Sequence, residues 1–419
     1  SEVKMAKSLG VYIHIPFCAG KCAYCDFYSL ADSDDLMPEY QSAVIAHIKE
    51  SSMLLDGYTI DSVYFGGGTP SFYGAQNLIQ ILAALKKYGH VSKNAEITAE
   101  MNPDSTDPAE LARMKKAGFN RLSFGVQSTD DGLLKSLGRL HSFKQAEDAF
   151  YAARNVGFKN ISLDLMYGLP SQTREAWADT LVRAAALQPE HFSCYGLKIE
   201  PGTSLYEFKD SPFIPDDDTQ ADMYLYTVEA LERFGYRQYE ISNFAQRGFE
   251  SKHNLKYWQR GEYIGFGAAA HSFVGSERYS NISDVKKYIE NIKNGQSVID
   301  YCETINDFEK SGEYIMLGLR TTHGISEEEY RAIYQCSFDG AKRLFAEYIK
   351  NGWMVENNGR WSFTPKGFLI SNTLIGNIIE EQTKQRFLVG TPWKEAGLDD
   401  VQVELFESQF STPLFDGMR

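Results

Sequence analysis

Three cysteines within eight residues constrain this chain more than any other feature of its sequence. Cys18, Cys22 and Cys25 directly follow the apolar run Val11–Phe17, which is typical of a buried strand. Eight residues reach at most about 25–30 Å when fully extended, so the three thiols can surround one metal centre. Thiolates bind zinc or iron–sulfur clusters, and both usually take four protein ligands. The alternatives are therefore a three-cysteine cluster with one open iron, a zinc site completed by a residue such as His14, or unligated core thiols.

Composition limits the compartment and the partners of the protein. A chain of 419 residues suggests two or three domains. It has no run of about 18 apolar residues, so no membrane span is predicted, and membrane association is expected at most through partners. The first ten residues lack an apolar segment of the kind found in signal peptides. The net charge of −14 argues against nucleic acid as a partner. The remaining cysteines, Cys194, Cys302 and Cys336, are far apart, which fits a reducing cytoplasm.

Between residue 11 and about residue 200, short apolar strands alternate with amphipathic helices. The predicted strands are Val11–Ile15, Ser62–Phe65, Glu96–Met101, Arg121–Gly125, Ile161–Tyr167 and Phe192–Lys198. Helical spacing between them covers Glu39–Leu54, Ala75–Lys87, Pro108–Lys116 and Ser142–Asn155. Six β-then-α units in succession imply a parallel sheet with right-handed crossovers. We therefore predict an α/β fold, a partial (β/α)6 TIM-like barrel.

Unusual polar residues follow these strands, one strand after another. Barrel folds place their chemistry on the loops at the carboxyl ends of the strands, so we expect a single site there. After the cysteine loop, the candidates are Gly66–Ser71, Glu100–Pro103, Gln127, Ser128, Asp164, Tyr167–Pro170 and Tyr195–Lys198. Several have ordinary structural alternatives: Gly66–Gly68 as a turn, Glu100 and Asp164 as helix caps, and Gln127 as a partner of a neighbouring backbone group. Arg139, in the segment Leu137–His141, is a further candidate, whose alternative is a surface residue.

The spacing Cys-x3-Cys-x2-Cys, with an aromatic residue before the last cysteine, resembles the radical S-adenosylmethionine (SAM) superfamily. The resemblance implies a [4Fe-4S] cluster held by Cys18, Cys22 and Cys25, whose open iron is chelated by SAM. In that family an electron from the cluster cleaves SAM to a 5′-deoxyadenosyl radical. Cleavage by this chain is an open question, and no catalytic residue is assigned.

Further segments resemble the anaerobic coproporphyrinogen III oxidase branch of that superfamily: His14–Cys18, Gly66–Pro70, Ser123–Ser128, Gly138–His141 and Asp164–Pro170. The resemblance covers roughly residues 10–275. By it, the SAM-contacting positions are Tyr12, Gly67, Gly68, Thr69, Glu100, Gln127, Arg139 and Asp164.

One departure distinguishes two groups within this branch. The oxidases carry another cysteine two residues after the third cluster cysteine, where this chain has Phe27. They also have a longer segment before the first cysteine. Both features resemble instead the haem chaperone group called HemW, related to porphyrin biosynthesis enzymes. The resemblance implies a haem-binding chaperone that transfers haem to respiratory proteins. An oxidase that decarboxylates porphyrinogen propionates, and a scaffold with an inactive cofactor pocket, are the alternatives.

The segment His253–Trp258 resembles the haem-binding motif of that group. Imidazole is a common axial haem ligand, so His253 is the candidate ligand, and Tyr257 and Trp258 offer flat apolar area for a porphyrin. Basic residues near it, Lys252, Lys256 and Arg260, are candidates for propionate pairing. The alternative is a histidine that packs against an aromatic core. We expect haem to be a cargo on a surface beside the cofactor site; His271 and Cys194 are weaker ligand candidates.

The sequence pattern changes after about residue 290. We predict residues 1–10 as a leader, 11–290 as the core, 291–382 as a helical, winged-helix-like domain and 383–419 as a tail of unknown role. Asn291–Thr304 is predicted to be a linker. Helices are expected over Phe308–Leu319, Glu327–Tyr334 and Phe338–Asn351, followed by a hairpin at Asn358 and Gly359 and a last helix through Ile379.

Overall fold

The structure is a computed structural model and describes residues 7–388. The chain divides into two compact units. The first unit contains residues up to Arg237, Ser242–Lys256 and Gly261–Thr304. The second contains Gln238–Ile241 and Tyr257–Arg260 together with the residues from Ile305 onward. The helix α10 (Lys252–Trp258) therefore has residues in both units.

The first unit is built on six parallel strands that alternate with helices. The strands are β1 (Lys7–Ile15), β2 (Tyr58–Gly67), β3 (Val91–Met101), β4 (Arg121–Gln127), β5 (Ile161–Tyr167) and β6 (His191–Gly196). The helices are α1 (Met37–Glu50), α2 (Ser52–Leu55), α3 (Pro70–Tyr73), α4 (Ala75–Tyr88), α5 (Pro108–Ala117), α6 (Asp131–Ser136), α7 (Phe143–Asn155), α8 (Arg174–Ala186) and α9 (Asp217–Arg233). Each of the six strands pairs in parallel with the next, which confirms the predicted fold class. Because β1 begins at Lys7, residues 7–10 belong to the strand and not to the predicted leader.

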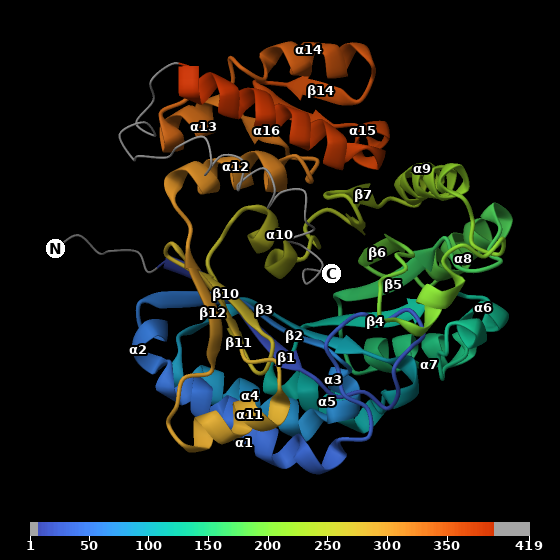
Figure 1. The fold of residues 1–419 in the computed structure, drawn as a ribbon. Coiled ribbons are helices and arrows are strands. Elements are labelled where there is room, and N and C mark those ends of the chain that lie inside the picture. Colours follow the sequence, from blue (N-terminus) through green and yellow to red (C-terminus); the bar gives the residue numbers. More distant parts are fainter. Residues whose placement is uncertain (1–6, 389–419) are drawn as a thin grey trace. The chain divides into compact units, whose positions relative to one another are not determined.

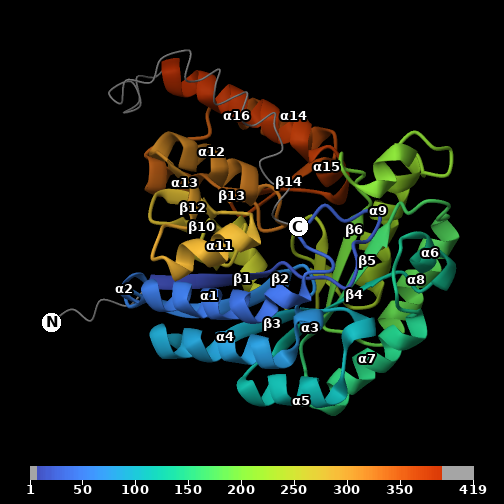
Figure 2. The same ribbon diagram turned by 60° about the horizontal axis from the view of Figure 1, so that its bottom comes forward.

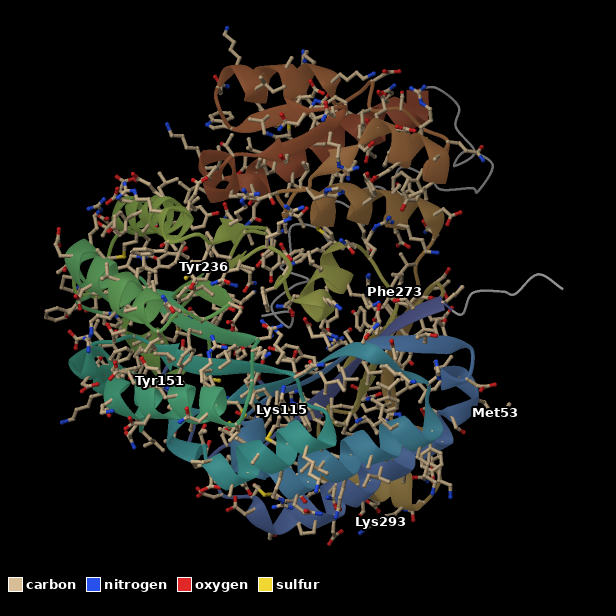
Figure 3. All side chains as sticks on the ribbon, turned by 180° about the vertical axis from the view of Figure 1, so that it is seen from behind. Met53, Lys115, Tyr151, Tyr236, Phe273 and Lys293 are labelled. Atoms are coloured by element: carbon tan, nitrogen blue, oxygen red, sulfur yellow. The ribbon has the colours of Figure 1, made fainter. Side chains whose placement is uncertain are left out.

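Helices cover the outer side of this sheet (Figures 1 and 2), and α1, α4 and α5 lie side by side there. Their ends have identifiable signals. Asp107 caps α5 by accepting from the backbone N–H of Glu110 at 3.0 Å, and Gly118, with φ of 113°, ends it. Ser142 and Gln145 form a capping box at the start of α7. Figure 3 shows Lys115 on α5 and Tyr151 on α7 among the side chains of these helices.

The two faces of the parallel strands differ in chemistry. Val11, Ile13 and Ile15 of β1 join the apolar core, whereas Tyr12 and His14 point to the opposite face, as strand geometry requires. The same alternation gives β2 to β6 a polar inner face: Ser62, Tyr64, Glu96, Thr98, Glu100, Arg121, Ser123, Ser162, Asp164, His191 and Ser193. Parallel strands with both faces covered are usually apolar throughout. A polar inner face therefore indicates that these strands line a site.

Further strands extend the sheet at both edges. They are β7 (Arg237–Gln238), β8 (Asn243–Ala245), β9 (Tyr263–Phe266), β10 (His271–Val274), β11 (Glu277–Asn281) and β12 (Ile299–Thr304). The strand order is β12-β11-β10-β9-β1-β2-β3-β4-β5-β6-β8-β7. The prediction of a linker at Asn291–Thr304 is wrong, because α11 (Val285–Lys293) and β12 occupy most of it. β12 pairs with β11 through backbone hydrogen bonds and the Arg278–Glu303 ion pair, so it needs no apolar pattern.

The second unit combines helices with a small antiparallel sheet. The helices are α12 (Asp307–Gly318), α13 (Glu327–Tyr334), α14 (Lys342–Lys350), α15 (Pro365–Leu369) and α16 (Ser371–Leu388). The strands β13 (Ile325–Ser326), β14 (Met354–Asn357) and β15 (Arg360–Phe363) lie in the order β13-β15-β14. Asn358 and Gly359 both have positive φ, which confirms the predicted hairpin turn. Of the predicted tail, residues beyond 388 lie outside the described range. Within that range, the helices are all too short or too polar to cross a membrane.

Candidate functional site

The cysteine loop follows β1 and is held at several points of its backbone. The N–H of Cys18 donates to the carbonyl of Leu30 at 3.0 Å, and the N–H of Cys25 donates to that of Cys22 at 3.1 Å. The N–H of Ala23 donates to a carbonyl just after α6. All three thiols are half-buried. The loop is thus fixed at the carboxyl ends of the strands, as predicted.

Each cysteine sulfur accepts a hydrogen bond from a different source. The hydroxyl of Thr69 donates to Cys18 Sγ at 3.3 Å, and Nη1 of Arg139 lies 3.6 Å from Cys22 Sγ. Burial raises the pKa of the Cys25 thiol to about 11, against the effect of the backbone N–H of Phe27, which donates to it. Such donors stabilise thiolates, the form that binds iron.

The donor chemistry of this loop fits an iron–sulfur cluster, and the residues around it fit SAM. Three cysteines with sulfur-directed donors would hold three irons, and the acidic acceptors Glu100 and Asp164 lie on β3 and β5 of the same sheet. The Nε of Arg139 is buried without a hydrogen-bond partner in the described residues, so it can donate to a ligand carboxylate. Within residues 7–388, no group of three or more His, Cys, Asp or Glu side chains could hold a single metal ion.

The glycines at the end of β2 are required by contacts within the protein. A Cβ on Gly67, which has φ of 114°, would lie 2.4 Å from the ring of His14. A Cβ on Gly68 would lie 2.7 Å from the carbonyl oxygens of Ile15 and Phe17. The segment therefore packs closely on β1 and the cysteine loop, which brings Thr69 to Cys18.

Glu100 is the acidic group with the clearest functional signature. Its Oε1 accepts from the hydroxyl of Tyr64 at 2.9 Å, and its Oε2 accepts from the N–H of Gly67 at 3.1 Å. Burial raises the pKa of Glu100 to about 7, and the negative charge of Asp164 acts in the same direction. A carboxylate that titrates near neutrality can accept a ligand hydroxyl or ammonium in a pH-dependent way.

The negative charge of Asp164 raises the pKa of Glu100, and Asp164 has its own set of serine donors. Ser123 Oγ lies 3.0 Å from both of its oxygens, and Ser162 Oγ lies 3.2 Å from Oδ1. Burial raises the pKa of Asp164, although hydrogen bonds from Ser193 and Ser123 lower it. Neither Glu100 nor Asp164 caps a helix, so the alternative role as helix caps is excluded for both.

Gln127 and Arg139 meet beside Gly125. A Cβ on Gly125 would lie 3.1 Å from Gln127 Nε2 and 3.3 Å from Arg139 Nη2. The strand register of β4 against β5 shifts between Gly125 and Gln127, and Gln127 has φ of 66°. This bulge turns Gln127 toward the carboxyl ends of the strands. Arg139 is half-buried and donates to the carbonyl of Gly125 at 2.6 Å, so it is not a surface residue.

His253 lies inside the first unit rather than on a separate surface. It is 1% exposed, and its Nδ1 lies 3.0 Å from the hydroxyl of Ser62. Its ring stacks on Tyr64 at 5.3 Å and on Tyr12 at 6.5 Å between centroids. Burial lowers the pKa of His253 to about 3, so its imidazole is neutral at neutral pH. The expectation of a separate surface cluster is therefore wrong: His253 adjoins the predicted SAM-site residue Tyr12.

The basic residues near His253 are engaged within the protein. Lys256 is 9% exposed, and its Nζ lies 3.0 Å from Asp61 and 2.6 Å from the hydroxyl of Ser8. Arg260 belongs to the second unit, where its guanidinium lies over the ring of Tyr314 at 5.1 Å. Lys252 is exposed. The predicted basic face around His253 is thus reduced to Lys252.

The other haem-site candidates lie elsewhere. Tyr257 and Trp258 are half-buried and belong to the second unit. Cys194 is 2% exposed on the outer, apolar face of β6, and burial raises its pKa. His271 begins β10, and burial lowers its pKa.

Two residues connect the site: sequence reasoning missed Tyr64 and included Asn102 only within the candidate range Glu100–Pro103, with no role of its own. Tyr64 links Glu100 to His253, and Asn102 donates from Nδ2 to Thr69 at 3.4 Å and accepts from Arg139 at 2.9 Å. Tyr64 could have been found from the strand alternation, which puts it on the same face as Ser62. Nothing in the sequence distinguishes the role of Asn102 from that of a turn residue.

Comparison with known proteins identifies the family. Residues 12–184 match the Radical SAM superfamily, and residues 309–370 match the HemN C-terminal domain. Heme chaperone HemW of Bacillus subtilis is 37% identical over 379 residues, which cover 88% of this chain and 99% of that protein. The chain belongs to the HemW family. HemW of Haemophilus influenzae is 34% identical and HemW of Escherichia coli 33% identical, each over 89% of this chain and 98% of the relative.

A solved structure supports the fold of this HemW family member. Coproporphyrinogen III oxidase (HemN) of Escherichia coli, described as a radical SAM enzyme, aligns with a TM-score of 0.79 at 22% identity. The alignment covers 90% of this chain and 91% of that one. The structural similarity therefore includes both segments that the family models match. At 22% identity it shows that the fold is similar.

Proposed function

We propose that this chain is a haem-binding, radical-SAM-type chaperone that carries a [4Fe-4S] cluster and SAM and transfers haem to respiratory proteins in the cytoplasm. The observation that carries the proposal is the relatedness to HemW proteins over nearly their whole length. Phe27, at the position where the oxidases have a further cysteine, supports the chaperone over the oxidase. When bound, the cluster and SAM would supply reductive cleavage of the sulfonium. SAM cleavage is not required by the proposal.

The residues of the chain divide the work as follows. Cys18, Cys22 and Cys25 hold the cluster, and Thr69 and Arg139 donate to its ligands. For SAM, Arg139 offers its Nε to the carboxylate, and Glu100 and Asp164 accept hydrogen bonds from the amine and hydroxyl groups. Tyr12, Gly67, Gly68 and Gln127 complete the pocket as lining residues. The polar inner face of the strands supports this assignment.

We propose His253 as the axial haem ligand, with Tyr257 and Trp258 on the porphyrin. The neutral imidazole is the form that binds iron. Because His253 is 1% exposed, coordination requires it to leave Ser62 and the rings of Tyr12 and Tyr64. Haem binding is therefore expected to displace α10 from β1 and β2.

The test begins with anaerobic reconstitution of the full chain. Iron and sulfide content, SAM affinity by calorimetry and haem affinity by Soret titration are measured together, followed by haem transfer to an apo-haem protein. Replacing Cys18, Cys22 or Cys25 by Ala should abolish the cluster, whereas Cys194→Ala, Cys302→Ala and Cys336→Ala are controls that should keep it. Absence of haem binding above background would refute the chaperone, and turnover of coproporphyrinogen would favour the oxidase.

A further inference from the structure

The two side chains that donate to the cysteine sulfurs meet at a third residue. Thr69 donates to Cys18, and Arg139 donates to Cys22. Asn102, directly after β3, bonds to both donors: its Nδ2 lies 3.4 Å from Thr69 Oγ1, and its Oδ1 lies 2.9 Å from Arg139 Nη2. A continuous chain of hydrogen bonds therefore joins the sulfurs of two cysteines.

The donor and acceptor chemistry of the side chains fixes the direction of each hydrogen bond in this series. Arginine has only donors, so the amide atom of Asn102 that faces Arg139 must be the oxygen. The amide nitrogen then faces Thr69 and donates to its hydroxyl oxygen. Since a threonine hydroxyl has one proton, that proton is left for Cys18 Sγ. Asn102 thus determines that Thr69 donates to the sulfur.

The backbone of Asn102 is also held, so its side chain starts from a fixed position. Its N–H donates to Ser71 Oγ at 2.9 Å. Its carbonyl accepts from Thr106 Oγ1 at 2.8 Å and from Ser105 Oγ at 3.3 Å. These bonds leave the side-chain amide to Thr69 and Arg139.

We propose that Asn102 is a positioning residue that aims the Thr69 hydroxyl and the Arg139 guanidinium at two cluster ligands and thereby raises the reduction potential of the cluster. Donors and positive charge near cluster sulfurs stabilise the reduced, more negative state, which raises its potential. The inference rests on the proposed cluster and concerns only how the chain adjusts it.

The test measures the midpoint potential of the cluster in the reconstituted protein. The protein is titrated stepwise with dithionite at known solution potentials, and the reduced fraction is followed by electron paramagnetic resonance. Asn102→Ala and Thr69→Val should each shift the potential to more negative values, and Thr69→Ser should restore it toward wild type. Because Asn102 acts partly through Thr69, the double variant should shift by less than the sum of the single shifts. Thr129→Val is the matched control: Thr129 is 2% exposed, bonds to Thr180 and should leave the potential unchanged.

The outcomes separate this inference from the proposed function. A wild-type potential in Asn102→Ala with full iron and sulfide would overturn it, and so would shifts of Asn102→Ala and Thr69→Val that simply add. A lower cluster content with an unchanged potential would show a merely structural role and overturn it too. Failure of wild type to take up a cluster would instead remove the proposed function, and this inference with it.

Discussion

At the scale of single residues, the surroundings of Glu100 decide its charge near neutral pH. Burial raises its pKa to about 7, whereas the hydrogen bonds from Tyr64 and Gly67 favour its charged form. The carboxylate is therefore close to half-protonated at neutral pH. A ligand group that donates to it is held more strongly by the deprotonated form.

We predict that SAM affinity falls as the pH is lowered through 7. If SAM binds only when Glu100 is ionised, the dissociation constant rises about tenfold between pH 8 and pH 6, because one unit below the pKa leaves about a tenth of the groups charged. Calorimetry on reconstituted protein measures it. Glu100→Gln should bind more weakly at pH 8 and lose this dependence, and it also corrects for titration of SAM itself. A wild-type profile in Glu100→Gln would rule out Glu100 as the acceptor.

Asp164 offers a second test of the same pocket. Replacing Asp164 by Ala should weaken SAM binding by about 1–3 kcal/mol if its oxygens accept from the ligand. Its serine donors Ser123 and Ser162 would also lose their acceptor, so the variant is paired with Ser162→Ala. Ser162→Ala should keep most of the affinity. Unchanged affinity in both Glu100→Ala and Asp164→Ala would exclude this pocket.

Residues with strong local signals could be predicted from the sequence, and residues that act through contacts could not. Cys18 and Glu100 come at or just after the ends of predicted strands and Asp164 lies within one, on its inward face, so their convergence follows from the topology. Tyr64 and Asn102 are defined by what they touch. The stacking of Tyr64 on His253 depends on the packing of α10 into the first unit, which no spacing in the sequence indicates.

At the scale of elements, α10 owes its position to a carboxylate from another part of the sheet. Glu96 on β3 is 6% exposed and accepts from the backbone N–H groups of Lys252 and His253, each at 3.2 Å. These are donors that the first turn of a helix leaves without intrahelical partners. One side chain thus fixes the start of α10 and the place of His253.

Removal of this carboxylate should destabilise the protein. Glu96→Ala removes the acceptor of the buried N–H group of His253 and of the partly buried N–H group of Lys252, so the free energy of unfolding is expected to fall by about 1–3 kcal/mol. Chemical denaturation of the reconstituted chain measures it. Glu232→Ala, an exposed site on α9, is the control and should change stability little. Equal stability of the two variants would mean that Glu96 does not hold α10.

The elements themselves show where sequence patterns succeed. β1 to β6 and the helices α1, α4, α5 and α7 were predicted, because each of these strands has an apolar outer face and each of these helices an apolar stripe, whereas α8 and α9 were not predicted. β12 was not predicted because its first four residues are exposed and form no apolar pattern. Backbone pairing with β11 holds the strand in place. The second-unit elements α13 and β15 were predicted, since a helical stripe and an Asn-Gly turn are local signals.

At the scale of the whole molecule, the two compact units do not follow the order of the chain. Gln238–Ile241 and Tyr257–Arg260 belong to the second unit although residues on either side of each belong to the first. The predicted boundary at residue 290 assumed that a change in pattern marks a change of unit. Compactness depends on contacts, and the first unit continues to Thr304. The proposed haem segment, His253 to Trp258, is therefore divided between the units.

The contacts of His253 predict that haem and SAM affect each other's binding. His253 stacks on Tyr64, and Tyr64 donates to Glu100, the proposed SAM acceptor. Haem needs His253 displaced, whereas the SAM pocket as described needs Tyr64 in place. Saturating SAM should therefore weaken haem binding, about fivefold or more, which is the lower range of typical coupling energies.

Linkage makes the prediction quantitative, because haem must weaken SAM binding by the same factor. Soret titrations with and without SAM, and calorimetry of SAM with and without haem, measure the two factors. Tyr64→Phe removes the hydroxyl that reaches Glu100 and should reduce both factors together. His323→Ala, an exposed histidine in the second unit, is the control and should retain them. His253→Ala should lose haem affinity while it keeps the cluster. Equal haem affinity with and without SAM in wild type would show that haem does not draw His253 away from Tyr64, and the axial ligand would then be sought elsewhere.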